Sequence, residues 1–202
     1  LYRGSIVYLG DIAQDDNETV EPGVGTEMEH HFDEGFGSFG VPVDFPTNKE
    51  GVRVWGKYCN SRNALLNTNT TMMDNFLLGR GAVSNDDAET RDKAISTLTN
   101  TWEMVSAATA INYLNTARSE ANFGDDAIRC HALSEAVAFL YNTLFVPESK
   151  MTQTKLDELF ELIGGSSEWS ALNFYTPFRA KLGQAVDEIS AIYQLDEVKN
   201  DL

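Results

Sequence analysis

The stretch from residue 84 to residue 118 constrains the fold more than any other part of the chain. Ser84-Asn85-Asp86-Asp87 supplies the small and acidic side chains that begin a helix. Apolar residues then recur every three or four positions, among them Ile95, Leu98, Trp102 and Val105. The pattern predicts one helix that runs to about Arg118, which is the length of helix found in bundles.

Five other segments have helical patterns. Apolar residues at helical spacing predict helices near residues 26–34, 52–79, 125–146, 156–163 and 178–193, and residues 1–14 also have a helix-compatible pattern. The segment of residues 52–79 is either one helix or two that break near residues 67–70. Alternating strand patterns are nearly absent. The sequence therefore predicts an all-α helical bundle that forms one domain over residues 1–202, with a helix rich in His and Glu and a Gly/Phe loop in residues 1–50 and the long helices in residues 51–202.

Local signals set some of the expected ends of these helices. Thr26 with Glu29 three residues later is a capping-box pattern, so the first of these helices begins there. Gly35, Gly37 and Gly40 are expected to end it, and the aromatic residues between them to form a compact loop up to Phe45. Gly79-Arg80-Gly81 is expected to end the helix of residues 52–79.

The charge of the chain excludes some classes of partner. The formal net charge is -16, so the phosphates of nucleic acid and anionic membrane surfaces are repelled. No apolar run is long enough to cross a bilayer, which predicts a protein that is not transmembrane. Cys59 and Cys130 form one disulfide or remain two thiols, and their apolar helical surroundings favour thiols.

The richest chemistry lies between Glu27 and Gly40. On a helix, Glu27, His31 and Glu34 share one face, and His30 lies on the neighbouring face with Asp33. Imidazole and carboxylate groups at this spacing are ligands for a metal ion such as iron or zinc. The alternative is that these residues are solvated side chains near the end of a helix in an acidic chain.

The same stretch carries a family resemblance. Residues 26–37, which run into Phe39-Gly40-Val41-Pro42, resemble the signature of the imelysin-like proteins, and residues 75–83 and 131–136 fit the same branch. The resemblance implies an all-helical fold and a metal-binding His-x-x-Glu motif at His31 and Glu34. Family members include proteins labelled metallopeptidases and others that are iron-linked binding proteins. Glu29 stands where imelysins proper have glycine, which argues against peptidase activity.

The resemblance also implies a location and a partner. Imelysin-like proteins of this branch belong to the bacterial cell envelope, so we expect an exported protein. We expect it in the periplasm or at the outer-membrane surface of a Gram-negative bacterium, as a lipoprotein. Related chains have helices ahead of the motif. We therefore expect this chain to be the C-terminal portion of a longer two-bundle protein, with its own N-terminal portion or another envelope protein as a partner.

Three more residues are candidates for the site. His131 and Glu135 are four positions apart on a helix and are expected either to complete the metal shell across the bundle or to be ordinary helix residues. Arg80 pairs with the acids of the first helix, binds an anionic ligand or lies free on the surface.

The sequence thus predicts a metal-binding protein of the cell envelope. His31 and Glu34 are the expected ligands, with Glu27 or His30 assisting. One alternative is a metallopeptidase in which Glu34 acts as general base. The other is a metal-free module that binds a protein or a glycan through the aromatic stretch from Gly35 to Phe45. No residue is assigned a catalytic role.

Overall fold

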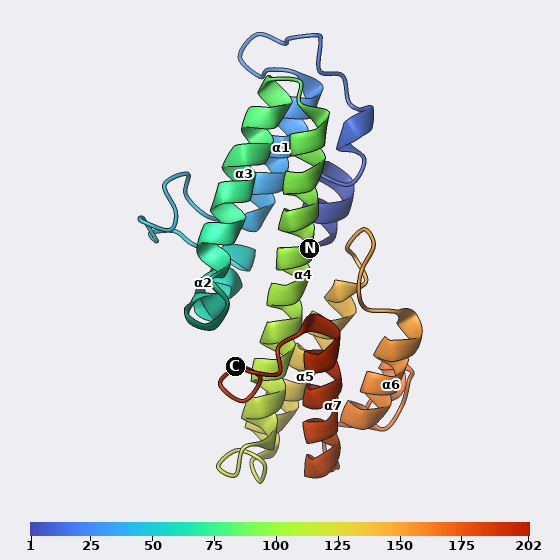
Figure 1. Ribbon diagram of the computed structural model, residues 1–202. Coiled ribbons are helices and arrows are strands. Elements are labelled where there is room, and N and C mark those ends of the chain that lie inside the picture. The colour runs from blue at the N-terminus through green and yellow to red at the C-terminus, as the bar shows by residue number, and fades with distance from the viewer. The chain divides into compact units, whose positions relative to one another are not determined.

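The computed structural model describes all residues from 1 to 202 and contains helices but no strands, which confirms the all-α prediction (Figure 1). The backbone divides into two compact units, residues 1–105 with 145–147 and residues 106–144 with 148–202. The organisation as a single domain stays a prediction.

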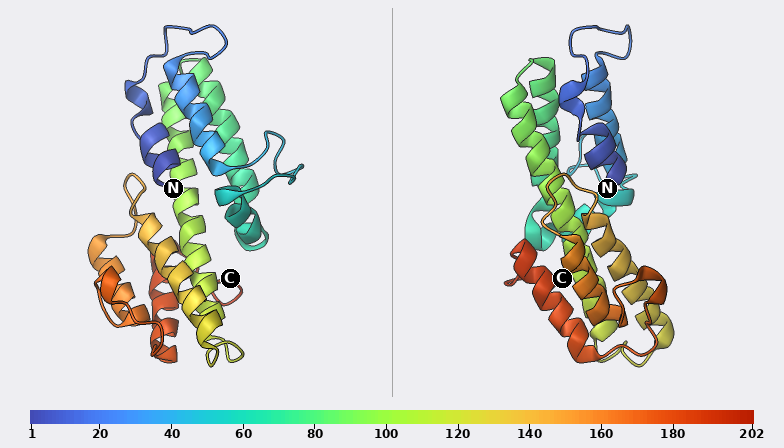
Figure 2. Two further views of the ribbon diagram at one scale, coloured as in Figure 1. Left: turned by 180° about the vertical axis from the view of Figure 1, so that it is seen from behind. Right: turned by 90° about the vertical axis from the view of Figure 1, so that its right-hand side faces the viewer.

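The first unit is built from helices that pack side by side. It contains a short π-helix η1 (Arg3–Tyr8), a 3-10 turn η2 (Ile12–Gln14), α1 (Glu27–Phe39), α2 (Val54–Leu66), α3 (Thr68–Ser84) and the part of α4 (Ala88–Arg118) up to Val105. Helix α1 packs against η1, α2 and α3, and two further views show α1, α3 and the beginning of α4 running next to one another (Figure 2).

Aromatic rings form the core of this unit. The Phe39 ring lies 5.5 Å from that of Phe76 and 5.4 Å from that of Trp102, and the Trp55 ring lies 6.2 Å from that of Trp102. Phe39 and Trp102 have no exposed surface. This cluster fixes α1 against α3 and α4, because large buried rings in edge contact stabilise one arrangement of the helices.

The start of α1 is confirmed, and its expected end is wrong. Thr26 and Glu29 form the full capping box. Gly35 and Gly37 lie within the helix, however, and only Gly40, with a φ of 86°, ends it. Close packing explains why glycine stands at position 35 of the helix, since a Cβ atom there would lie 3.0 Å from the Leu9 side chain.

The next helices follow the two-helix alternative. Asn67, in the left-handed conformation with a φ of 51°, separates α2 from α3. Gly79-Arg80-Gly81 does not end α3, which continues to Ser84. Gly79 instead allows close packing, because a Cβ atom there would lie 2.6 Å from Cζ of Phe32.

The second unit contains the rest of α4, then α5 (Asp126–Thr143), α6 (Gln153–Gly164), the 3-10 turn η3 (Trp169–Ala171) and α7 (Arg179–Tyr193). Helix α6 packs against α5 and α7. The Asp125 carboxylate caps α5, the Thr152 hydroxyl caps α6, and Gly165 ends α6 in the left-handed conformation. Helix α4 spans 31 residues and ends at Arg118, as the sequence predicts.

Two other sequence predictions concern the whole chain. Cys59 and Cys130 are both free thiols, which is the alternative that their surroundings favour. None of the helices has the length and apolar content needed to traverse a lipid bilayer.

Candidate functional site

His31 of α1 is held by an acid from a different segment. Its Nδ1 lies 2.7 Å from Oδ2 of Asp15, which directly follows the turn η2. The His31 side chain is 32% exposed and that of Asp15 only 16%, so the pair is partly shielded from water. A neutral His31 therefore donates its Nδ1 proton to Asp15 and leaves the lone pair of Nε2 available to a ligand.

The other predicted ligands of α1 bind different partners. Glu27 Oε2 accepts a hydrogen bond of 3.2 Å from the backbone N–H of Asp16. Glu34 Oε1 lies 3.9 Å from Nε2 of His30, and both side chains are well exposed. The rings of His30 and His31 are 6.1 Å apart. The face expected from the sequence exists, but its side chains pair with neighbours instead of converging on one point.

His131 and Glu135 lie on α5, in the second unit. His131 is exposed, contacts the Tyr113 ring edge-on at 6.4 Å, and borders an open hollow that Cys130 and Phe174 also line. The convergence of His131 and Glu135 with the residues of α1 stays a prediction.

These donors do not form a metal centre in the structure. No three side chains of the types His, Cys, Asp and Glu are grouped so as to hold a metal ion. The donors of α1 are therefore not grouped as a preformed iron or zinc site.

Arg80 of α3 is paired with the acids of α1, one of the three alternatives that the sequence left. Its Nη1 donates to Oε1 of Glu29 at 2.9 Å, and its Nε donates to Oδ1 of Asp33 at 2.8 Å. The Ser84 hydroxyl also donates to Glu29 Oε1, at 2.7 Å. The hydrogen bond from Ser84, then that from the Thr26 N–H, then Arg80 hold the pKa of Glu29 below its ordinary value. This network ties α1 to α3.

An apolar groove lies beside this network. It has a volume of about 170 Å³ and is lined by side chains of α1, α3 and the segment that follows α1. The apolar ones are Phe32, Phe36, Val43, Met73, Phe76 and Leu77, and the charged ones are Asp33 and Arg80. The rim is open to water, since Val43 is 79% exposed and Leu77 is 65% exposed. We name this feature the α1–α3 groove.

Sequence reasoning found only part of the groove. The aromatic stretch after Gly35 was a candidate binding surface, and Phe36 and Val43 do line the groove. The contribution of α3 was missed. The available signal was the pair Leu77-Leu78, because two consecutive leucines cannot both face the core of one helix.

The comparisons with known proteins give the family without a function. No curated protein and no solved structure matches the chain. One family model matches residues 10–170, which includes α1 with its histidines and all of α3 with Arg80. The chain belongs to the family described as Domain of unknown function (DUF4856).

Proposed function

We propose that the protein is a binding module that holds an apolar segment of another protein in the α1–α3 groove. The supporting observation is the apolar rim, where Val43 and Leu77 remain largely exposed although each is a large hydrophobic side chain. Each Å² of apolar surface removed from water contributes about 25 cal/mol, so covering such a rim favours association. This is the metal-free alternative of the sequence analysis, with its surface extended onto α3.

The size of the groove limits what it can hold. A volume of about 170 Å³ accommodates one or two apolar side chains. The groove therefore suits the anchor residues of a peptide or of a helix, which bind by inserting a few side chains while the surrounding contacts exclude water.

A peptide-display selection on the intact protein tests this proposal. Selected peptides should be rich in apolar anchors and should lose about tenfold or more in affinity for Leu77→Asp, as hot-spot contacts do. Leu65→Asp is the matched control, because Leu65 is also an exposed leucine, 40% accessible, but lies on α2 outside the groove. Peptides that bind both variants equally well would disprove the proposal.

Cation binding at α1 is the second candidate, and the orientation of His31 favours it. A carboxylate that fixes one ring nitrogen is the usual support for a histidine that binds a metal through the other nitrogen. Metal ligation requires neutral imidazole, so binding should weaken at acidic pH.

Calorimetric titration of Fe²⁺ and Zn²⁺ into wild type, His31→Ala and Glu34→Ala tests this candidate, with Glu168→Ala, which removes an exposed acid of the other unit, as the control. Loss of affinity in the α1 variants alone would support the site. Equal affinity in all four proteins would exclude it. The same experiment in the presence of a groove peptide separates the two candidate functions.

We further propose that the chain is related to the imelysin-like proteins and acts in the cell envelope. The support is the resemblance of residues 26–42, 75–83 and 131–136. Release of the protein by osmotic shock, or its labelling by a membrane-impermeant reagent on intact cells, would support this location. Recovery in the cytoplasmic fraction alone would contradict it.

A further inference from the structure

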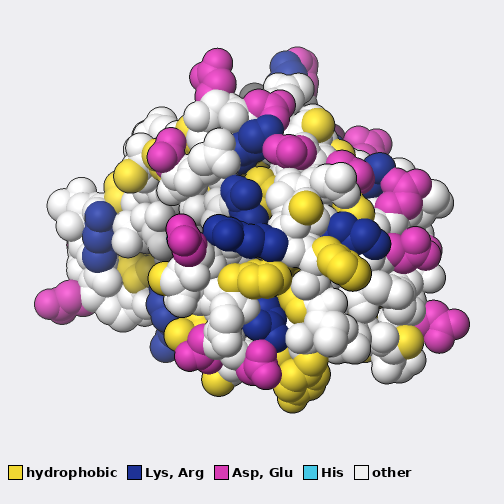
Figure 3. Space-filling view, turned by 90° about the horizontal axis from the view of Figure 1, so that it is seen from below, with side chains coloured by type: hydrophobic (Ala, Val, Ile, Leu, Met, Phe, Trp, Pro, Cys, Tyr) yellow, Lys and Arg dark blue, Asp and Glu magenta, His cyan; other side chains and the backbone are white.

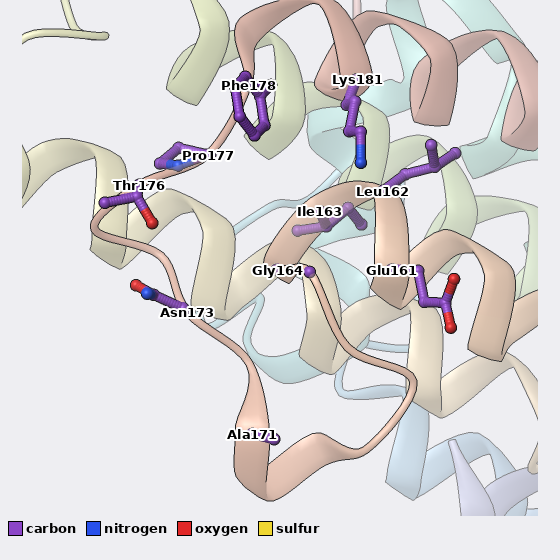
Figure 4. A pocket seen from close by; sticks show the side chains of 11 residues that line it. Glu161, Leu162, Ile163, Gly164, Ala171, Asn173, Thr176, Pro177, Phe178 and Lys181 are labelled. Atoms are coloured by element: carbon purple, nitrogen blue, oxygen red, sulfur yellow. The ribbon is translucent and has the colours of Figure 1, made fainter.

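A second hollow lies within the second unit and has a different chemistry. Its volume is about 290 Å³, and it is formed by the end of α6, the segment of residues 171–177 and the first turn of α7 (Figure 4). The segment is well anchored. The Asn173 N–H donates to Gly164 O at 2.9 Å, and the buried Arg129 donates to the carbonyl oxygens of Phe174 and Tyr175. The chain's own hydrogen bonds therefore hold this wall in place.

An aromatic ring and a cation lie together at this hollow. Phe178 and Lys181 extend from the first turn of α7 toward the end of α6 (Figure 4). Phe178 is 69% exposed, and Nζ of Lys181 lies 5.7 Å from the centroid of its ring. An exposed phenyl ring of this kind offers a flat face on which a ligand can stack.

The ammonium group of Lys181 forms no ion pair, which sets it apart from two other lysines of this unit. Lys155 pairs with Glu158 and Glu188, and Lys199 pairs with Asp187 and Asp196. The chain has 31 acidic and 15 basic residues, so acidic neighbours are abundant. A lysine whose ammonium group contacts an aromatic ring instead of an acid is available to bind an anionic group of a ligand.

Other basic residues lie close to this turn of α7. Arg179 Nε donates to the backbone oxygen of Arg118 at 2.6 Å, and Nη1 of Arg118 lies 3.7 Å from the Cβ position of Gly183. Figure 3 shows Lys and Arg side chains beside hydrophobic ones near the centre of the face that it draws. Arg179 and Arg118 therefore add positive charge near the part of α7 that contains Lys181.

The lining indicates the class of ligand. Thr176, Asn173 and Glu161 supply hydroxyl, amide and carboxylate groups next to the apolar Phe178 and Pro177. A sugar ring likewise combines apolar and polar parts, with C–H groups on its faces and hydroxyl groups at its rim. A carboxylate on the ring would complement Lys181. The volume is close to the lower end of the range for small-ligand pockets, which suits one or two sugar rings.

We propose that this hollow binds a carboxylated sugar of the uronic acid class, with the sugar face on Phe178 and the carboxylate at Lys181. A bare phosphate would make no use of the ring. An anionic bilayer would be repelled by the net charge of -16. The hollow lies in a different unit from the α1–α3 groove, so each proposal can fail without the other.

Titration of the full chain with glucuronic acid, followed by amide NMR, tests the proposal. The amides of Gly164 and Gly165, which line the hollow, should shift, and glucose should bind more weakly because it lacks the carboxylate. The dissociation constant should rise about threefold in Lys181→Met and about fivefold in Phe178→Ala, as for an exposed ion pair and an aromatic contact.

Two matched variants serve as controls. Lys49→Met removes an exposed lysine of the first unit, and Tyr175→Ala removes an aromatic ring that is 71% exposed but does not line this hollow. Both should bind glucuronic acid as wild type does. The proposal is overturned if the amides of the hollow do not shift, if glucose binds as tightly as glucuronic acid, or if inorganic phosphate shifts the same amides as strongly.

Discussion

Replacing Glu29 should destabilise the first unit, because this carboxylate makes three interactions at once. It accepts from the Thr26 N–H in the capping box at 3.2 Å, from Arg80 Nη1 at 2.9 Å and from the Ser84 hydroxyl at 2.7 Å. The capping hydrogen bond contributes about 1 kcal/mol to the free energy of unfolding. The two interactions with α3 contribute about 1 kcal/mol together, since Arg80 is partly exposed and the ion pair is screened by water.

Urea unfolding of two variants separates these contributions. Glu29→Ala should lose about 2 kcal/mol, which lowers the midpoint by about 1 M when the slope is near 2 kcal/mol per M. Glu29→Gln retains an oxygen for the capping box, so it should lose about half as much. Glu50→Ala, an exposed loop variant, is the control. A midpoint for Glu29→Ala equal to that of the control would refute the reasoning.

The pH dependence provides an independent check. The pKa of Glu29 is lowered in the folded state, chiefly by the Ser84 hydroxyl and then by the Thr26 N–H and Arg80. A lowered pKa stabilises the protein above the ordinary value of a glutamate, about 4.3, and this stabilisation is lost as the pH falls through the folded-state value. The difference between wild type and Glu29→Gln should thus be constant near pH 7 and should shrink as the pH falls below about 4. A difference that grows on acidification would contradict the assignment.

Three further outcomes are expected. Gly79→Ala should lower the free energy of unfolding in urea by about 1 to 3 kcal/mol, because its Cβ would lie 2.6 Å from Phe32. Gly81→Ala on the same helix, where nothing lies within 4 Å of the Cβ position, should raise it by about 0.5 to 1 kcal/mol. Equal effects of the two substitutions would contradict the packing argument. Burial raises the pKa of Cys59 to about 11, so iodoacetamide at pH 8 should label the partly exposed Cys130 first. Peptide mass mapping would show the order of labelling, and faster labelling of Cys59 would disprove this prediction. Arg129→Met should lower the free energy of unfolding by about 3 kcal/mol, because three backbone oxygens lose a buried donor. Circular dichroism during heating would measure the loss of stability, and an unchanged melting temperature would contradict this prediction.

The helices could be predicted from the sequence where their signals are local. The capping box at Thr26 and the long apolar periodicity after Asp87 involve only neighbouring residues, and both are confirmed. The helix ends predicted from glycines are wrong for α1 and α3. Gly35 and Gly79 normally suggest a break, but each faces a bulky side chain from another helix or turn, and only the packed structure shows why glycine is needed there.

The candidate site shows the same limit. Helical spacing correctly placed Glu27, His31 and Glu34 on one face, yet their partners come from elsewhere. Asp15 and the N–H of Asp16 belong to a segment before α1, and no periodicity in the sequence relates them to His31 or Glu27. The metal-binding function expected from that face stays a prediction.

The pairing of Arg80 has a consequence for the α1–α3 groove. One guanidinium group there pairs with two carboxylates, those of Glu29 and Asp33, so one negative charge remains uncompensated beside the groove. If the groove binds a segment as proposed, a basic residue next to the apolar anchor should strengthen the complex, and that gain should fall as ionic strength rises.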